Sequence, residues 1–359
     1  MACRAVASHN DDKSSSEGIR CFYLMYDVYS KDQRSFKCIV MDKLTGETND
    51  LTISPAPNTR EPQFFLKLYT AVSIGSTIYM IGGACRCHFC PDDVIHLLHA
   101  HAEVRVFNPL RPEDGWRDVA RMHIPRLRPA AVVVDGMIYV FGGTKLEDPE
   151  DGEWYDPNTD TWHLFSAEGY QPSLACVEAF YVDPTSGAKK VVVKSRWHDD
   201  PSLYTFLLDE QIWETGTSVR FKNCASSCVL GNIIYALVVN DDPDESSDEE
   251  YDKKYDEKQV LQAYHLIRKQ WFPVELPPGI LIIAKATHII ASGSDRLCLM
   301  FHKFVKGEGV ECDRMTCLEL RLDEEYTTGS DGMTINATKV SSTYFAVKFD
   351  EFRQVVITL

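Results

Sequence analysis

No stretch of this sequence is apolar for long enough to cross a bilayer as a helix, which requires roughly 18–20 consecutive apolar residues. The N-terminus, "MACRAVASHNDDKSSSEG", also lacks the apolar segment of a secretory signal peptide. We therefore expect no membrane partner and a location in the cytoplasm or nucleus. Residues 1–18 are mostly small or polar, so we expect this segment to be disordered.

Basic residues are fewer than acidic residues. The chain has 37 Lys and Arg and 53 Asp and Glu, which gives a formal net charge of −16. Such a charge argues against nucleic acid or an anionic membrane as the main partner. Acidic residues concentrate in "NDDPDESSDEEYDKKYDEK" (240–258), where three basic and ten acidic residues give a net charge of −7 (3 − 10). This segment is too charged to pack, and we expect a disordered acidic loop there.

The chain also lacks the patterns of common catalytic sites, since it contains no Ser-His-Asp arrangement, phosphate-binding loop or dinucleotide fingerprint. This favours a protein that is not an enzyme. The chain has twelve cysteines, and without an export signal we expect reduced thiols rather than a disulfide framework. Several lie in apolar segments, as buried cysteines do: Cys176, Cys228, Cys298 and Cys317.

A repeated strand–turn–strand pattern is what the chain does contain. It occurs in "AVSIGSTIYMIGG" (71–83), "AVVVDGMIYVFGG" (131–143) and "SCVLGNIIYALVV" (227–239). Each segment has an apolar run, a turn with glycine and a second apolar run, and Asp135-Gly136 is a strong signal for a two-residue hairpin turn. The starting points are 60 and 96 residues apart, which indicates a period near 50 with one degenerate unit. Strand repeats of this period are typical of propeller blades.

An aromatic residue and a tryptophan, with six residues between them, follow the strand–turn–strand unit. The pairs are Tyr155 and Trp162, Phe206 and Trp213, and Tyr264 and Trp271, with Phe107 and Trp116 as a longer version. We interpret each pair as part of a second hairpin. Its first aromatic residue packs within the blade, and its tryptophan covers the next blade.

The double glycines Gly82-Gly83 and Gly142-Gly143, followed by this aromatic pair, resemble the kelch repeat. "RMHIPRLRPAAVVVDGMIYVFGG" (121–143) with the following "EWYDPNTDTW" is similar to it, and especially to the C-terminal half of plant F-box/kelch proteins. The resemblance implies an all-β, six-bladed kelch-type β-propeller over residues 19–359. We place the blades at 19–62, 63–126, 127–168, 169–218, 219–280 and 281–335.

The first blade starts late, at "IRCFYLMYDVYS", which we predict to be its second strand. The tail "TYFAVKFDEFRQVVITL" (343–359) could supply the inner strand and close the ring without a free edge. The segment before the first strand is too short for an F-box. We therefore expect the substrate-binding half of an F-box/kelch protein without its ligase-binding half, which argues against binding to a cullin ubiquitin ligase.

The resemblance also implies that loops on one face of the propeller bind the partner. The residues mapped to this face are rich in basic and aromatic side chains: Arg86, Arg126, Arg128, Arg196, Trp197, His198, Phe221, Asn223, Lys285, His288 and His302. Such a face suits an acidic peptide or an anionic small molecule. The alternative is that Arg126 and Arg128 pair with neighbouring loops and hold the propeller together.

The stretch "ACRCHFCPDDVIHLLHAHAE" (84–103) is an insertion on the same face. Its Cys and His residues are of the types that bind zinc, although the spacing C-x-C-H-x-C is not that of common structural zinc sites. His88, Asp92 and His96 are four residues apart and could hold iron, similar to the Glu-x₃-Asp-x₃-His triad of kelch-type specifier proteins. The third interpretation is a packed loop that only carries these side chains.

The sequence therefore predicts a monomeric, non-enzymatic interaction module with a protein target. It would be a substrate adaptor or scaffold related to F-box/kelch ubiquitin-ligase receptors, with no cofactor. The alternative is an enzyme or small-molecule binder of plant specialised metabolism, which would depend on a metal at residues 85–101.

Overall fold

The computed structural model describes only part of the chain, and all statements below concern that part. The described residues are 5–7, 21–29, 34–42, 45, 47–53, 69–85, 99–144, 152–165, 177–182, 189–195, 202–219, 221, 224–239, 258–278, 280, 282–283, 288–307, 310–326, 333–346 and 354–358. Their regular structure is β-strand apart from one short 3-10 helix, η2 (Pro112–Asp114). None of these residues belongs to a helix long and apolar enough to span a membrane.

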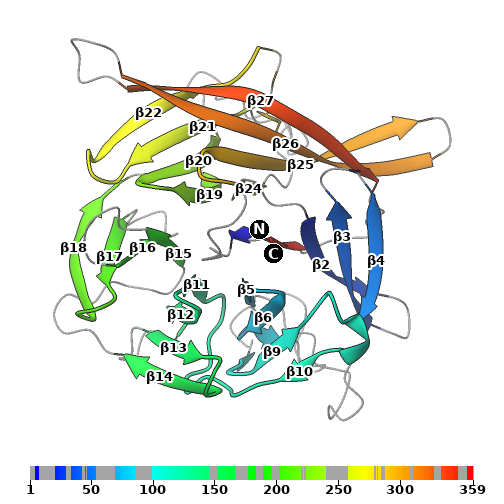
Figure 1. The fold of residues 1–359 in the computed structure, drawn as a ribbon, viewed down its shortest axis with the longest axis vertical. Coiled ribbons are helices and arrows are strands. Elements are labelled where there is room, and N and C mark those ends of the chain that lie inside the picture. The colour runs from blue at the N-terminus through cyan, green and yellow to red at the C-terminus, as the bar shows by residue number, and fades with distance from the viewer. Residues whose placement is uncertain are drawn as a thin grey trace, which may run out of the picture.

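The strands form blades around a central axis, and both chain ends lie near this axis (Figure 1). This is the predicted all-β, six-bladed propeller. Blades 2, 3 and 4 are four-stranded antiparallel sheets whose strands follow in chain order from the axis outward. They comprise β5 (Thr70–Ile74), β6 (Thr77–Ile81), β9 (Val104–Phe107) and β10 (Arg117–Asp118); β11 (Ala130–Val134), β12 (Met137–Phe141), β13 (Gly152–Asp156) and β14 (Thr161–Phe165); and β15 (Val177–Val182), β16 (Lys190–Ser195), β17 (Ser202–Leu207) and β18 (Ile212–Ser218).

Blade 1 is built from both ends of the chain. Its strands, in order, are β1 (Ala5–Ala7), β28 (Gln354–Thr358), β2 (Cys21–Tyr29), β3 (Arg34–Asp42) and β4 (Thr48–Ile53). β28 pairs antiparallel with β2, with Phe22 opposite Thr358, which confirms that the tail supplies the missing inner strand. β1 pairs parallel with β28. A strand therefore forms within the segment that was predicted to be disordered.

Blades 5 and 6 are fused into one sheet. Their strands are β19 (Cys224–Leu230), β20 (Ile233–Val239), β21 (Lys258–His265) and β22 (Gln270–Glu275), then β24 (His288–Ala291), β25 (Arg296–Gly307), β26 (Val310–Tyr326) and β27 (Met333–Ala346), with β23 (Ile282–Ile283) beside β21. The outer strands β22 and β27 pair in parallel, with Val274 opposite Ile335. Blade 6 therefore extends beyond the predicted limit at residue 335, because its outer strand only begins at Met333.

The hydrophobic core lies between neighbouring blades. Val72 and Val104 of blade 2 pack with Tyr155 and Trp162 of blade 3 in one cluster. Tyr155 and Trp162 lie directly opposite each other on β13 and β14, so both project from the same face of the blade. That face meets blade 2. The tryptophan thus covers the preceding blade, and the prediction that it covers the next blade was wrong.

Two buried cysteines of blade 6 differ from the expectation of reduced thiols. Cys298 on β25 and Cys317 on β26 are paired as a disulfide, with their Cα atoms 6.3 Å apart. The antiparallel pairing of these two strands brings the cysteines together. Met300 lies opposite Cys317, and Cys298 is two residues before Met300 on the same face of the sheet. Cys228 is a free, buried cysteine, and burial raises the pKa of its thiol.

Candidate interaction face

Antiparallel strands place successive connections of a blade on opposite sides of the ring. Gly75, Gly136 and Gly231 lie in the turns from the first to the second strand, on one side. The connections from the second to the third strand lie on the other side, together with the segments that lead into each first strand. We call this second side the loop face and residues 121–129 the lead-in segment of blade 3.

At the junction of blades 2 and 3, the base of the Cys/His stretch lies against the lead-in segment. The short strands β7 (Ala84–Cys85) and β8 (His99–Ala100) pair and close the stretch at its base. The Gly83 N–H donates to the Arg126 carbonyl at 2.8 Å, and the Arg126 N–H donates to the His101 carbonyl at 3.0 Å. Two parts of the predicted site thus meet on the loop face.

This backbone docking explains one glycine of each double-glycine pair. Gly82 and Gly143 have φ of +60° and +75°, in the left-handed region that side chains disfavour. A Cβ atom on Gly82 would lie 2.7 Å from the Arg126 carbonyl oxygen, and one on Gly143 would lie 2.7 Å from the Leu127 carbonyl oxygen. The glycines are required because the lead-in backbone passes directly over them.

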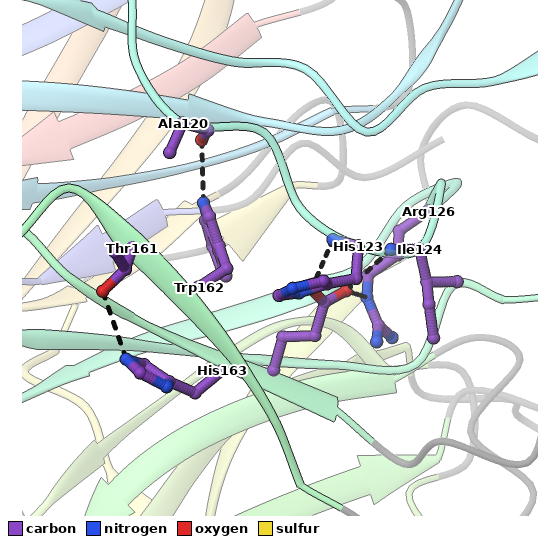
Figure 2. A network of polar contacts seen from close by, with 8 residues as sticks. Ala120, His123, Ile124, Arg126, Thr161, Trp162 and His163 are labelled. Atoms are coloured by element: carbon purple, nitrogen blue, oxygen red, sulfur yellow. Dashed lines mark hydrogen bonds and ion pairs between the residues drawn. The ribbon is translucent and has the colours of Figure 1, made fainter.

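Beneath the loop face, Arg126 and Glu153 form a buried ion pair (Figure 2). The Arg126 Nε lies 3.2 Å from Glu153 Oε1, and its Nη1 donates to the Gly142 carbonyl at 2.8 Å. The carboxylate also accepts the backbone N–H groups of His123 at 2.7 Å and Ile124 at 3.2 Å. The His123 Nδ1 lies 3.1 Å from Glu153 Oε2. The carboxylate therefore fixes the lead-in segment through both its backbone and its side chains.

The position of Arg126 corrects its predicted role as a partner-binding residue. Its side chain is 0% exposed, so it matches the alternative in which it holds the propeller together. Arg128, with φ of +53°, is half-buried, and the His123 side chain is 50% exposed. Sequence reasoning missed His123 and Glu153. The signal for Glu153 was a charged residue directly before the aromatic residues Trp154 and Tyr155 in β13.

A second buried ion pair lies at the junction of blades 4 and 5. The Lys194 Nζ, on β16, is 2.9 Å from Glu178 Oε2 on β15, and these side chains are 4% and 11% exposed. Lys194 also donates to Ser227 Oγ at 3.0 Å and lies 3.3 Å from Cys224 Sγ, both on β19. Its Nζ lies 4.7 Å from the centroid of the Phe221 ring. One cation thus joins the two blades at the loop face.

Lys194 occupies a position that is apolar in blade 3. Ile138 pairs with Tyr155 and Val191 pairs with Phe206, so Phe141 and Lys194, three residues further on, are equivalent. Phe141 packs edge-on against Phe206 and Trp213 of blade 4. Sequence reasoning missed Lys194, although a lysine inside the apolar run "KVVVKS" was a visible signal.

Phe221 and His288, two predicted site residues, also lie at blade junctions. Phe221 is half-buried and packs edge-on against Trp271, with the two ring centroids 4.9 Å apart. His288 is the first residue of β24 and is only 3% exposed, so its predicted place on the binding surface is not supported. The next residue, Ile289, donates its N–H to Ser226 Oγ at 3.2 Å and so connects blade 6 to blade 5.

His302 was predicted to lie in a connection between strands, and this prediction was wrong. It lies within β25, opposite Met315, and the strand continues to Gly307 because the hairpin with β26 turns only after that residue. The other predicted site residues lie outside the described part of the chain: Arg86, His88, Asp92, His96, Arg196, Trp197, His198, Asn223 and Lys285. Among the residues that are described, no three potential metal ligands form a group.

Comparison with known proteins agrees with this geometry. Residues 125–166 match the family described as Kelch motif, and they include the end of the lead-in segment and all four strands of blade 3. This part of the chain is similar to a kelch repeat. The match therefore covers the blade in which the glycine pair, the buried ion pair and the aromatic pair occur together.

The chain is also similar to F-box/kelch-repeat proteins of Arabidopsis thaliana. It is 27% identical to F-box/kelch-repeat protein At5g39560 over 54% of its own length and 47% of that protein. It is 40% identical to putative F-box/kelch-repeat protein At3g46050 over 26% of its own length and 22% of that protein. The chain thus spans about half the length, or less, of these curated relatives. These similarities agree with the propeller fold of the described residues.

Proposed function

We propose that the loop face binds an acidic segment of a target protein. One observation carries this proposal. At two junctions, the end of a blade's second strand contacts the segment leading into the next blade. Gly83, two residues after β6, contacts Arg126, and Lys194 of β16 contacts Phe221. Segments that are separate in the sequence therefore meet on the loop face at these two junctions.

The charge distribution supports an acidic target. The chain carries a net charge of −16, so the basic residues of the loop face stand out against an acidic molecule. Arg128 is half-buried and His123 is 50% exposed there, while Arg126 and Lys194 lie buried beneath. Arginine binds carboxylates through two parallel hydrogen bonds, which gives both affinity and specificity.

The similarity to F-box/kelch-repeat proteins supports a finer proposal, in which the chain is a substrate adaptor or scaffold. In that role it would hold a target for a ubiquitin ligase. Affinity purification of the full chain with its bound target tests this role. A ligase subunit should be recovered with the wild-type chain and, where the adaptor role is correct, loss of the chain should stabilise the target in cells.

Binding itself is tested with a library of acidic, neutral and basic peptides. Arg128→Glu and Arg196→Glu should each weaken the tightest acidic peptide by on the order of tenfold, equal to about 1.4 kcal/mol, and the affinity should fall with salt. Lys269→Glu is the matched control, because Lys269 is exposed in the turn between β21 and β22 on the opposite side of the ring. Equal losses in all three variants, or no preference for acidic peptides, would contradict the proposal.

Metal binding by the Cys/His stretch is a second candidate. It is favoured by the pairing of β7 with β8, which sets Cys85 opposite His99 and returns the two ends of the stretch to one place. The test is the metal content of protein purified anaerobically without chelator, beside a His88→Ala/His96→Ala variant. Iron that is present in the wild type and lost in the variant would support an enzyme. Zinc that is lost in the variant would support a loop held by a structural metal. If neither protein contains metal, both interpretations are wrong.

A further inference from the structure

Lys194 and Cys224 form a lysine–cysteine contact across the junction of blades 4 and 5. The Nζ of Lys194 lies 3.3 Å from the Sγ of Cys224, and the two residues are 30 positions apart in the chain. The Cys224 thiol donates its hydrogen to the Ser226 carbonyl at 3.5 Å. The thiol hydrogen thus points away from Lys194, and a lone pair of the sulfur faces the amine.

The surroundings of this contact fit a reactive pair rather than a packing contact. The Lys194 side chain is 4% exposed and is held by Glu178 at 2.9 Å and Ser227 at 3.0 Å, so it cannot move away from the sulfur without breaking both contacts. Cys224 is a free cysteine of intermediate exposure, which a small oxidant can reach. Cys228, four residues further along the same strand, is buried.

We propose that Lys194 and Cys224 are the site of an oxidative crosslink between blades 4 and 5. Hydrogen peroxide first oxidises the thiol to sulfenic acid and is itself reduced to water. The Lys194 ammonium gives one proton to the Glu178 carboxylate, which passes it to solvent. The neutral amine then attacks the sulfur, an S–N bond forms, the S–O bond breaks, and the hydroxyl leaves as water with the second amine proton.

The overall reaction is balanced. One thiol, one ammonium and one hydrogen peroxide give one sulfenamide S–N bond, two waters and one proton. The sulfur loses two electrons and the peroxide gains them. A thiol reductant such as dithiothreitol reverses the crosslink, because it restores the free thiol and amine and is itself oxidised to a disulfide.

The crosslink would change the loop face in two ways. It would remove the positive charge that faces Glu178 and the Phe221 ring, and it would fix β16 to β19 covalently. The crosslink does not depend on the proposed acidic target. It makes this junction of the propeller responsive to peroxide.

The experiment treats the purified full chain with hydrogen peroxide, removes the excess with catalase, alkylates free thiols in denaturant and digests with trypsin. Mass spectrometry should detect a peptide pair joined through Lys194 and Cys224, lighter by two hydrogen atoms than the separate peptides. Cleavage after Lys194 should be lost in that species. Dithiothreitol before digestion should restore both cleavage and the free thiol.

Three controls make the result decisive. Cys228→Ser should leave the crosslink unchanged, whereas Cys224→Ser and Lys194→Arg should abolish it. Peroxide treatment in denaturant should give oxidised Cys224 without the crosslink, because the contact exists only in the folded chain. If folded wild-type protein carries sulfenic or sulfinic acid at Cys224, or an unmodified Cys224, without any joined peptide, the proposal is wrong.

Discussion

Two buried ion pairs of the described residues, Arg126 with Glu153 and Lys194 with Glu178, differ in what their carboxylates bind. Glu153, in blade 3, is 0% exposed and accepts two backbone N–H groups as well as the side chains of Arg126 and His123. Glu178, in blade 4, is 11% exposed and accepts only side-chain donors among the contacts described here, from Lys194 and Ser227. The first pair fixes a backbone segment within one blade, and the second joins side chains of two blades.

Blade 3 has the glycine pair that lets backbone dock on backbone, while blade 4 has Ser195 and Arg196 at the equivalent positions. Among the described residues, Lys194 connects the junction of blades 4 and 5 through contacts with Ser227 and Cys224. The comparison shows that the described contacts at the junction of blades 4 and 5 include polar side-chain contacts at a position where blade 3 has the apolar Phe141. Those side chains are then available for chemistry.

The largest expected effect separates the two carboxylates. Glu153→Gln should lower the free energy of unfolding by about 3–5 kcal/mol, because it leaves the Arg126 charge buried without its counter-ion. Glu178→Gln should cost less, about 1–2 kcal/mol, because Glu178 is 11% exposed and a buried lysine, unlike an arginine, can release its proton when its counter-ion is removed. Urea unfolding of both variants checks this, with the exposed Glu210→Gln as a control expected within about 0.5 kcal/mol of wild type. An equal decrease in the free energy of unfolding for both variants would contradict this difference between the two carboxylates.

An intermediate effect concerns the backbone docking. Gly82→Ala should cost about 2–4 kcal/mol, because it adds a left-handed alanine and an overlap with the Arg126 carbonyl. Gly136→Ala is the matched control: its φ is +75°, but nothing lies within 4 Å of the added Cβ. We expect about 1–2 kcal/mol there, from the backbone conformation alone. The unfolding free energies of the two variants should differ in this order, and the reverse order would contradict the docking.

The smallest effect is confined to alkaline pH. Burial, followed by a hydrogen bond to Asp160 at 2.8 Å, raises the pKa of Tyr155 above its ordinary value near 10. Its stabilisation is therefore complete below about pH 10 and is lost as pH rises toward the folded-state pKa, because only the unfolded chain ionises there. The equivalent residue of blade 4 is Phe206, which does not titrate. Tyr155→Phe should flatten the decline of unfolding free energy above about pH 10, and an unchanged slope would assign the decline to other tyrosines.

The sequence was sufficient for features that repeat locally. The glycine pairs, the hairpin at Asp135-Gly136 and the aromatic pair Tyr155 and Trp162 predicted both the fold and the best-formed blade. The closing strand at 354–358 was also predictable, because blade 1 began with a second strand and the tail offered a match. Each of these features can be read within one repeat or from a missing strand.

The candidate site was less predictable, because it depends on contacts between repeats. Nothing local shows that Arg126 turns inward to Glu153, or that Lys194 meets Cys224 across 30 residues. The direction in which Trp162 packs is set by which face of the sheet meets the preceding blade. His302 was misplaced because the turn of its hairpin lies several residues later than the apolar pattern indicated.

The pairing of Phe22 with Thr358 joins residues separated by almost the whole chain. As the protein is synthesised, blades 2 to 5 can form in turn from local hairpins, but the ring can close only when residues 354–358 have left the ribosome. Closure is thus a late step with a high contact order, and we expect it to be slow relative to the formation of single blades. Until then the inner edge of β2 is open, and this edge is where a growing chain is most exposed to pairing with the wrong strand.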